Sequence, residues 1–261
     1  MAAIPYHTGI QPTRICDSPR IVVAPCFLSA QECEHFKELG IKHGMSRAKL
    51  VGNTTGVDTT SEARTNVSCW LQHNVTPITQ QVVERIANFV GLPLDNAEQI
   101  QLIYYQASQY YMAHYDGWAQ PGPNEPEAPI GSEAHIVKER YMNGQGGQRM
   151  LTTLCYLNTL PGTVAGGETE FPNLRMLEQP TPVMPLDPSQ PMPPPKVLKI
   201  YPEAGKLVCF SNVYDGTNKL HPNSLHAGCP VNNVIDPATG QTIQAEKWAF
   251  NLWFRENKAR R

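Results

Sequence analysis

After the first 98 residues the chain contains many short apolar segments, and this pattern limits the folds that the sequence can adopt. Each segment is rich in aromatic or β-branched residues and is bounded by Gly, Pro or Asn, as β-strands commonly are. Strands are expected at 20–23, 99–106, 110–115, 149–157, 197–201, 207–210 and 247–254. Many short strands that follow helices favour a β-sandwich or barrel with supporting helices over an alternating βαβ fold.

Two helices are expected in the first third of the chain, and both carry capping signals. Ser29 fits an N-cap with Glu32 three residues later, and Gly40 is a natural end for this helix. Thr76 fits the N-cap of the second helix, which begins with proline and keeps a helical apolar period up to Gly91. The sequence therefore predicts helices over about 30–39 and 77–90.

The composition excludes several classes of protein. The chain has 21 basic and 23 acidic residues, so its formal net charge is −2, and neither nucleic acid nor an anionic membrane is expected as a partner. A hydrophobic content of 41% excludes disorder over the whole chain. No apolar run approaches the ~20 residues that a membrane span requires. We expect a globular protein with no nucleic-acid or membrane partner.

The length of 261 residues fits a single domain over 1–261. Residues 1–19 are expected to form an N-terminal extension, and 118–148, 176–196 and 232–244 are expected to be loop insertions. Seven cysteines, an odd number without a C-x-x-C pair, indicate reduced thiols, and no signal peptide is visible at the N-terminus. These features predict a cytoplasmic protein, and they leave its oligomeric state open.

One pair of residues at the end of an expected strand is suited to binding a metal. His114 and Asp116 are two residues apart, so in a strand both side chains point to the same face. His226 is the best candidate for a third ligand, with His221 as a rival. Two histidines and one carboxylate form the facial triad of non-haem Fe(II) oxygenases, although the same set also suits a zinc hydrolase.

The segments around these residues resemble those of a known enzyme family. They follow one another in the order 105–116, 149–158, 166–172, 202–208, 225–231 and 247–255, with the pair Arg64-Thr65 before them. As a series they resemble the prolyl 4-hydroxylase family of Fe(II)/2-oxoglutarate-dependent dioxygenases, from about residue 21 to residue 255. The resemblance implies a mainly β fold, a double-stranded β-helix (jelly roll) with N-terminal helices packed on the sheet.

The resemblance also implies roles for individual residues. His114, Asp116 and His226 match the iron ligands, and the retained carboxylate of Asp116 favours hydroxylation over halogenation. Lys247 matches the lysine that binds the distal carboxylate of 2-oxoglutarate. It follows His226 by 21 residues, a wider spacing than in the family, and Lys206 is the alternative.

Three further residues match positions that line the pocket for 2-oxoglutarate, namely Tyr105, Thr152 and Tyr111, the last of which could also support the substrate. Trp248 and Trp253 are expected to pack in the β-structure rather than to take part in the site.

The function implied by the family is an oxidoreductase activity that uses Fe(II), 2-oxoglutarate and O2, with ascorbate as a reductant. The expected reaction is 4-hydroxylation of prolyl residues in a peptide or protein, with release of succinate and CO2. Two alternatives stay open at this point. One is a dioxygenase that acts on a free amino acid or a small natural product, and the other is a non-enzymatic peptide-binding module derived from the fold.

Overall fold

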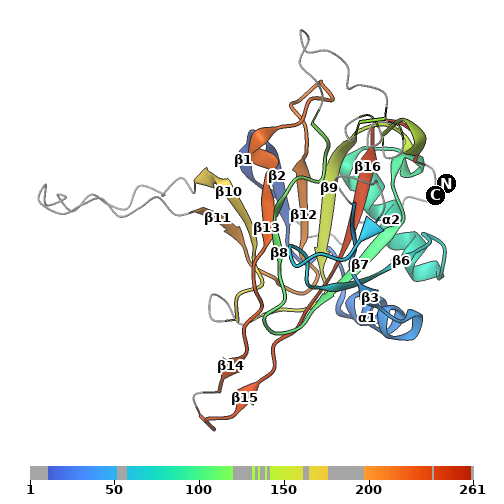
Figure 1. The fold of residues 1–261 in the computed structure, drawn as a ribbon. Helices are drawn as coiled ribbons and strands as arrows, with labels where there is room; N and C mark the ends of the chain where they lie inside the picture. The colour runs from blue at the N-terminus through green and yellow to red at the C-terminus, as the bar shows by residue number, and fades with distance from the viewer. Residues whose placement is uncertain are drawn as a thin grey trace, which may run out of the picture.

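The computed structural model describes residues 11–51, 58–119, 131, 132, 135, 139, 142–160, 165–175, 197–236 and 238–259. An eight-stranded antiparallel sheet forms the centre of the molecule (Figure 1). Its strands, in spatial order, are β1 (Thr13–Asp17), β2 (Arg20–Ala24), β12 (Leu207–Ser211), β9 (Arg149–Tyr156), β16 (Lys247–Arg255), β7 (Ile100–Tyr105), β6 (Val67–Leu71) and β3 (Ser46–Arg47).

A second, four-stranded antiparallel sheet packs against one face of the first. Its strands, in spatial order, are β11 (Val197–Ile200), β10 (Thr169–Arg175), β13 (His226–Gly228) and β8 (Tyr111–His114). Apolar side chains of both sheets form one buried cluster, in which Phe171 of β10 meets Phe210 of β12 edge to face with ring centroids 5.2 Å apart. Two packed antiparallel sheets with this shared core confirm the predicted jelly roll.

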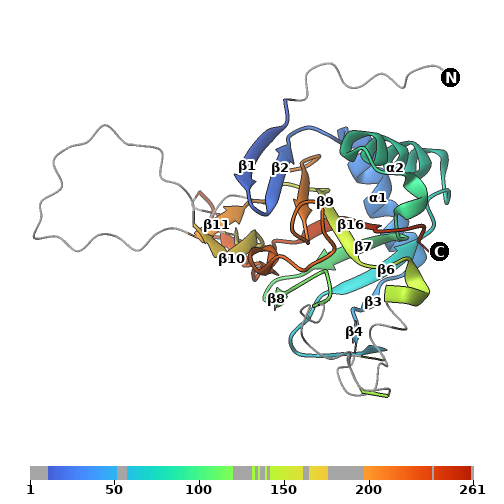
Figure 2. The ribbon, with the colours of Figure 1, turned by 90° about the horizontal axis from the view of Figure 1, so that it is seen from above.

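Helices cover the opposite face of the large sheet. Helix α1 (Ala30–His43) and helix α2 (Pro77–Val90) lie side by side on it, away from β10 and β11 (Figure 2). Their apolar faces share a second buried cluster with the sheet, where Phe36 stacks on Phe250 of β16 at 4.5 Å. Both predicted N-caps are confirmed, since Ser29 and Thr76 each form a capping box. Neither helix is long and apolar enough to span a membrane.

The first helix does not end at Gly40, as its sequence predicts. Helix α1 continues to His43, and Gly44, with a φ of 77°, follows it. Gly40 is buried against the sheet, where a Cβ atom would lie 2.6 Å from Cδ2 of Leu102 and 2.9 Å from Cζ3 of Trp248. This glycine is therefore explained by the close approach of the helix to the sheet, not by a helix end.

One predicted loop contains regular structure. Strands β14 (Val234–Ile235) and β15 (Thr242–Ile243) form a hairpin within 232–244, and Figure 1 shows this hairpin extending away from the two sheets. The expected loop 176–196 and most of 118–148 lie outside the described residues. The remaining short elements are β4 (Leu50–Val51), β5 (Asp58–Thr59), η1 (Leu94–Asn96), η3 (Asn143–Gln145) and η4 (Pro222–Ser224).

Candidate active site

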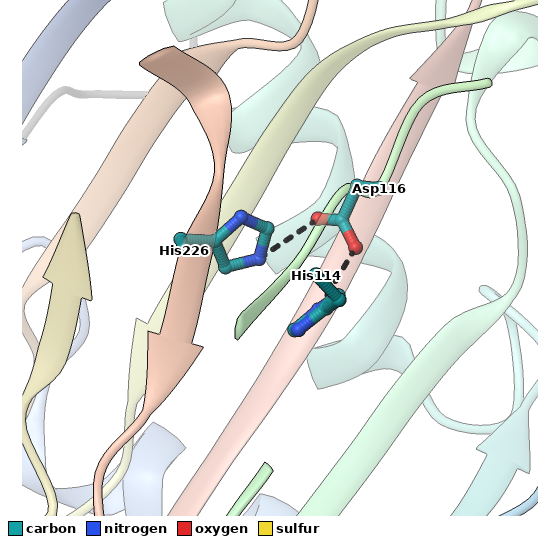
Figure 3. A group of neighbouring side chains, drawn as sticks. All are labelled: His114, Asp116 and His226. Carbon is teal, nitrogen blue, oxygen red and sulfur yellow. Dashed lines mark ion pairs between the residues drawn. The ribbon is translucent and has the colours of Figure 1, made fainter. Parts of the chain in front are cut away.

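Strands β8 and β13 of the small sheet bring the predicted metal ligands together. His114 and His226 are paired across these two strands, and Asp116 follows the end of β8 (Figure 3). Oδ1 of Asp116 lies 3.6 Å from Nε2 of His114, and Oδ2 lies 3.5 Å from Nε2 of His226. One possible ligand atom from each residue lies within 4.8 Å of those of the other two.

Backbone contacts determine which ring nitrogen of each imidazole carries the proton. Nδ1 of His114 donates to the carbonyl oxygen of Met112, and Nδ1 of His226 donates to that of Ser224, each at 2.9 Å. Because a carbonyl oxygen only accepts, Nδ1 carries the proton and a neutral imidazole keeps its lone pair on Nε2. Burial, followed by the neighbouring His114, lowers the pKa of His226 to about 4, so this ring is neutral at pH 7.

The carboxylate of Asp116 is ionised and held in place. Burial alone would raise its pKa, but the neighbouring His226 and His114 hold the pKa well below its usual range. Its Oδ2 accepts a hydrogen bond from Oγ1 of Thr152 at 2.7 Å and one from Nε1 of Trp253 at 2.8 Å. The Nε2 atoms of two imidazoles and an oriented carboxylate fit Fe(II), the metal that this ligand set typically binds in oxygenases.

A buried lysine lies in the same pocket, between the two sheets. Lys247 is 2% exposed and forms no ion pair with any described residue. Its ammonium lies 5.2 Å from the ring centre of Tyr105 and 5.4 Å from that of Tyr156. Burial lowers the pKa of Lys247 to about 8, and the nearby Cys229 and Glu168 limit this decrease. A buried cation with no ion-pair partner among the described residues fits the distal carboxylate of 2-oxoglutarate.

All seven site residues predicted from the sequence line one pocket of about 1090 Å³: Tyr105, Tyr111, His114, Asp116, Thr152, His226 and Lys247. Tyr111 stacks on the ring of His114 with centroids 3.5 Å apart. The alternative lysine, Lys206, is absent from the described pocket lining, and its ammonium pairs with Glu203 at 2.9 Å.

The rival ligand His221 is also in a different place. Its Nδ1 accepts from the backbone N–H of Asn223 at 3.1 Å, and its Nε2 lies 2.8 Å from the hydroxyl of Ser18. Both ring nitrogens therefore have partners in the described structure.

The prediction for Trp253 is wrong, whereas Trp248 packs in the core as expected. Trp253 lines the pocket and contacts Asp116 because successive side chains of β16 point to opposite faces of the sheet. The side chains that face the pocket are Lys247, Asn251, Trp253 and Arg255. The even-numbered residues of this strand lie in the core under the helices. Counting in steps of two from Lys247 would have identified Trp253 from the sequence.

Further residues that the sequence did not single out extend the pocket outward from the triad. Arg149 lies over the ring of Trp253, with its guanidinium carbon 3.9 Å from the ring centre. Glu98 accepts from Arg149 at 2.6 and 2.8 Å and from Arg255 at 2.5 Å. Burial alone would raise the pKa of Glu98, but these two guanidiniums lower it. Pairs of this kind, far apart in the sequence, leave no local signal.

Comparisons with known proteins identify the family. Residues 100–255 match the model of the 2OG-Fe(II) oxygenase superfamily. "Probable prolyl 4-hydroxylase 3" of Arabidopsis thaliana is 30% identical over 236 residues, which are 90% of this chain and 69% of that protein. The chain belongs to the prolyl 4-hydroxylase family of 2OG-Fe(II) oxygenases. Prolyl 4-hydroxylase 1 of the same plant is 29% identical, over 95% of this chain and 73% of its own length.

A solved structure supports the fold of this family member. The viral collagen prolyl hydroxylase of Paramecium bursaria Chlorella virus-1, in complex with 2OG, aligns with a TM-score of 0.57 and 23% identity. The alignment covers 92% of this chain and 97% of the viral chain. Membership of the family makes this chain a 2-oxoglutarate-dependent dioxygenase that uses Fe(II) and 2-oxoglutarate.

Proposed function

We propose that this enzyme hydroxylates prolyl residues of a peptide or protein at C4. The observation that carries the proposal is the presence, in one pocket, of the triad of His114, Asp116 and His226 and of the buried Lys247, for which the described part of the chain offers no ion pair. The names of its relatives, which are prolyl 4-hydroxylases, support the choice of substrate.

The triad and the lysine would each hold one component of the reaction. Nε2 of His114, Nε2 of His226 and the carboxylate of Asp116 would bind Fe(II). Lys247 would bind the distal carboxylate of 2-oxoglutarate, with Tyr105 beside it. The bound iron supplies the oxygen chemistry, in which one atom of O2 enters the substrate and 2-oxoglutarate becomes succinate and CO2.

The surrounding side chains would keep this arrangement fixed. Thr152 and Trp253 both donate to Oδ2 of Asp116, and these two hydrogen bonds orient the carboxylate. Neither of them uses Oδ1. Tyr111 stacks on one face of His114 and limits the movement of this ring. A rigid, partly dry ligand set keeps coordination positions open for the other components.

We include ascorbate as a reductant and a reducing, cytoplasmic location in the proposal. All seven cysteines are free thiols, which supports the location. Ascorbate would return iron to the Fe(II) state after turnovers that are not coupled to hydroxylation.

The function is tested by amino-acid analysis of proline-containing peptides after incubation with the enzyme, Fe(II), 2-oxoglutarate, ascorbate and air. We expect 4-hydroxyproline in the wild-type reaction and none with Asp116→Ala. Circular dichroism of this variant checks that it is folded. Succinate without hydroxyproline in any peptide would reject prolyl hydroxylation and favour a free amino acid or a small natural product as the substrate.

A further inference from the structure

The outer part of the pocket, beyond the triad, carries an excess of positive charge. Five of its lining side chains are cationic, namely Arg47, Lys49, Arg64, Arg149 and Arg255. Among the described lining residues, Glu98 is the only carboxylate outside the triad. We call these six residues the basic groove. The chain as a whole has a net charge of −2, so this excess is local.

The single carboxylate of the basic groove is already shared. Glu98 forms ion pairs with both Arg149 and Arg255, at 2.6 and 2.5 Å. Glu98 therefore does not neutralise the cations at the other end of the groove.

Arg64 lies in the middle of the groove, and its hydrogen-bond partners among the described side chains are uncharged. The guanidinium donates to Oδ1 of Asn66 at 3.0 Å and to Oε1 of Gln101 at 3.1 Å. It also lies over the ring of Tyr111, with its central carbon 4.6 Å from the ring centre. Its residue is 6% exposed. Its charge thus adds to the positive potential of the groove.

Arg47 and Lys49 form the exposed rim of the groove. The only ion pair of Arg47 among the described residues is with Glu62 at 3.3 Å, and the side chain of Glu62 is 92% exposed. Such an exposed pair contributes little and leaves Arg47 available to another anion. Lys49 forms no ion pair with a described residue. Both side chains are exposed and lie beside the pocket.

The cofactors of the enzyme would not neutralise this excess. The charges in the inner part of the pocket cancel. A divalent cation and the ammonium of Lys247 are positive, and they balance the carboxylate of Asp116 and the dicarboxylate. The positive charge of the basic groove is therefore left for the substrate. A neutral proline-rich peptide would not use it.

We propose that the peptide substrate carries Asp or Glu residues near the target proline, and that Arg47 and Lys49 recognise them. This proposal rests on the proposed function. The route from the triad runs from His114 through Tyr111 and Arg64 to Arg47, whose Nε donates to the carbonyl oxygen of Arg64 at 3.3 Å.

The test compares two peptides, each with one central proline flanked on both sides by several glutamates or by the same number of glutamines. We expect kcat/KM at low ionic strength to be about tenfold higher for the glutamate peptide, and the difference to shrink in high salt. The variant Arg47→Gln/Lys49→Gln should lose this preference and keep its KM for 2-oxoglutarate. The matched control Arg14→Gln/Lys258→Gln removes the same charges outside the described pocket lining and should keep the preference.

Binding of the same fluorescent peptides to the Mn(II)- and 2-oxoglutarate-loaded enzyme separates this proposal from the proposed function. Equal hydroxylation and equal binding of both peptides would overturn the acidic substrate and leave prolyl hydroxylation intact. A third outcome is that the enzyme binds the glutamate peptide preferentially, loses this preference in Arg47→Gln/Lys49→Gln, and hydroxylates neither peptide. This outcome would support recognition by the basic groove and overturn the proposed function. Displacement of both peptides by a more tightly bound single-stranded oligonucleotide would overturn a peptide ligand.

Discussion

At the scale of single residues, the carboxylate of Asp116 depends on two neighbouring hydrogen-bond donors. The variant Trp253→Phe keeps an aromatic ring, although a smaller one, and removes the indole N–H that donates to Oδ2 at 2.8 Å. We expect its affinity for Mn(II), measured by electron paramagnetic resonance, to fall by about tenfold or more, because such supporting bonds orient metal ligands. Trp70→Phe is the control, since Trp70 packs against Trp253 at 6.0 Å and has no bond to Asp116. Equal affinity of Trp253→Phe and wild type would contradict this role.

The pKa of Lys247 predicts how the binding of 2-oxoglutarate depends on pH. Its pKa is lowered to about 8, so the ammonium is present below this pH and is lost above it. Since the protonated form attracts the dicarboxylate, affinity should be constant below about pH 8 and fall by up to about tenfold per pH unit above it. Calorimetric titration of the Mn(II) enzyme measures this. Lys247→Met should bind weakly at every pH, whereas Lys206→Met should keep the wild-type profile; an unchanged profile in Lys247→Met would reject the assignment.

The residues of the site differ in how much the sequence reveals about them. His114 and Asp116 were predictable from their spacing of two residues at the end of an expected strand, although β8 ends at His114 and Asp116 lies just beyond it. His226 was predictable because of the motif around it. Trp253 and Glu98 act through contacts across strands, and no local pattern encodes those contacts. The pocket position of Trp253 nevertheless follows from its parity with Lys247 along β16.

At the scale of elements, Gly40 tests how closely α1 packs on the large sheet. An alanine normally stabilises a helix relative to glycine by about 1 kcal/mol. Here its Cβ would lie 2.6 Å from Leu102 and 2.9 Å from Trp248, so Gly40→Ala should lower the free energy of unfolding by about 1–3 kcal/mol. Urea denaturation measures the change. Lys42→Ala, on the exposed side of the same helix, should have little effect, and a more stable Gly40→Ala would refute tight packing.

Local signals were sufficient for most of the elements. Capping residues located the starts of α1 and α2, and alternation with β-branched residues located β7, β9 and β16. The three-residue strand β13 carries His226 of the triad but is too short to show a pattern. The wide spacing between His226 and Lys247 is explained by the β14–β15 hairpin between them, which leaves Lys247 paired with Tyr105 in the sheet.

At the scale of the whole molecule, the two sheets and the two helices divide the apolar side chains into two clusters. One cluster lies between the helices and the large sheet, and the other lies between the sheets. The pocket with the triad reaches into the space between the sheets, where burial makes the charges of Asp116 and Lys247 effective. The fold class followed from the order of helices and strands. The charge of the basic groove did not, because it is assembled from segments between residues 47 and 255.

The central claim is that this pocket is the site of a dioxygenase reaction, and labelling with ¹⁸O2 tests it most directly. The iron-loaded enzyme is incubated with 2-oxoglutarate and a proline-containing peptide, and both products are analysed by mass spectrometry. We predict one labelled oxygen in the new hydroxyl group of the peptide and one in succinate, and neither product with Asp116→Ala. A product that contains oxygen only from water, or turnover that persists without 2-oxoglutarate, would contradict the claim.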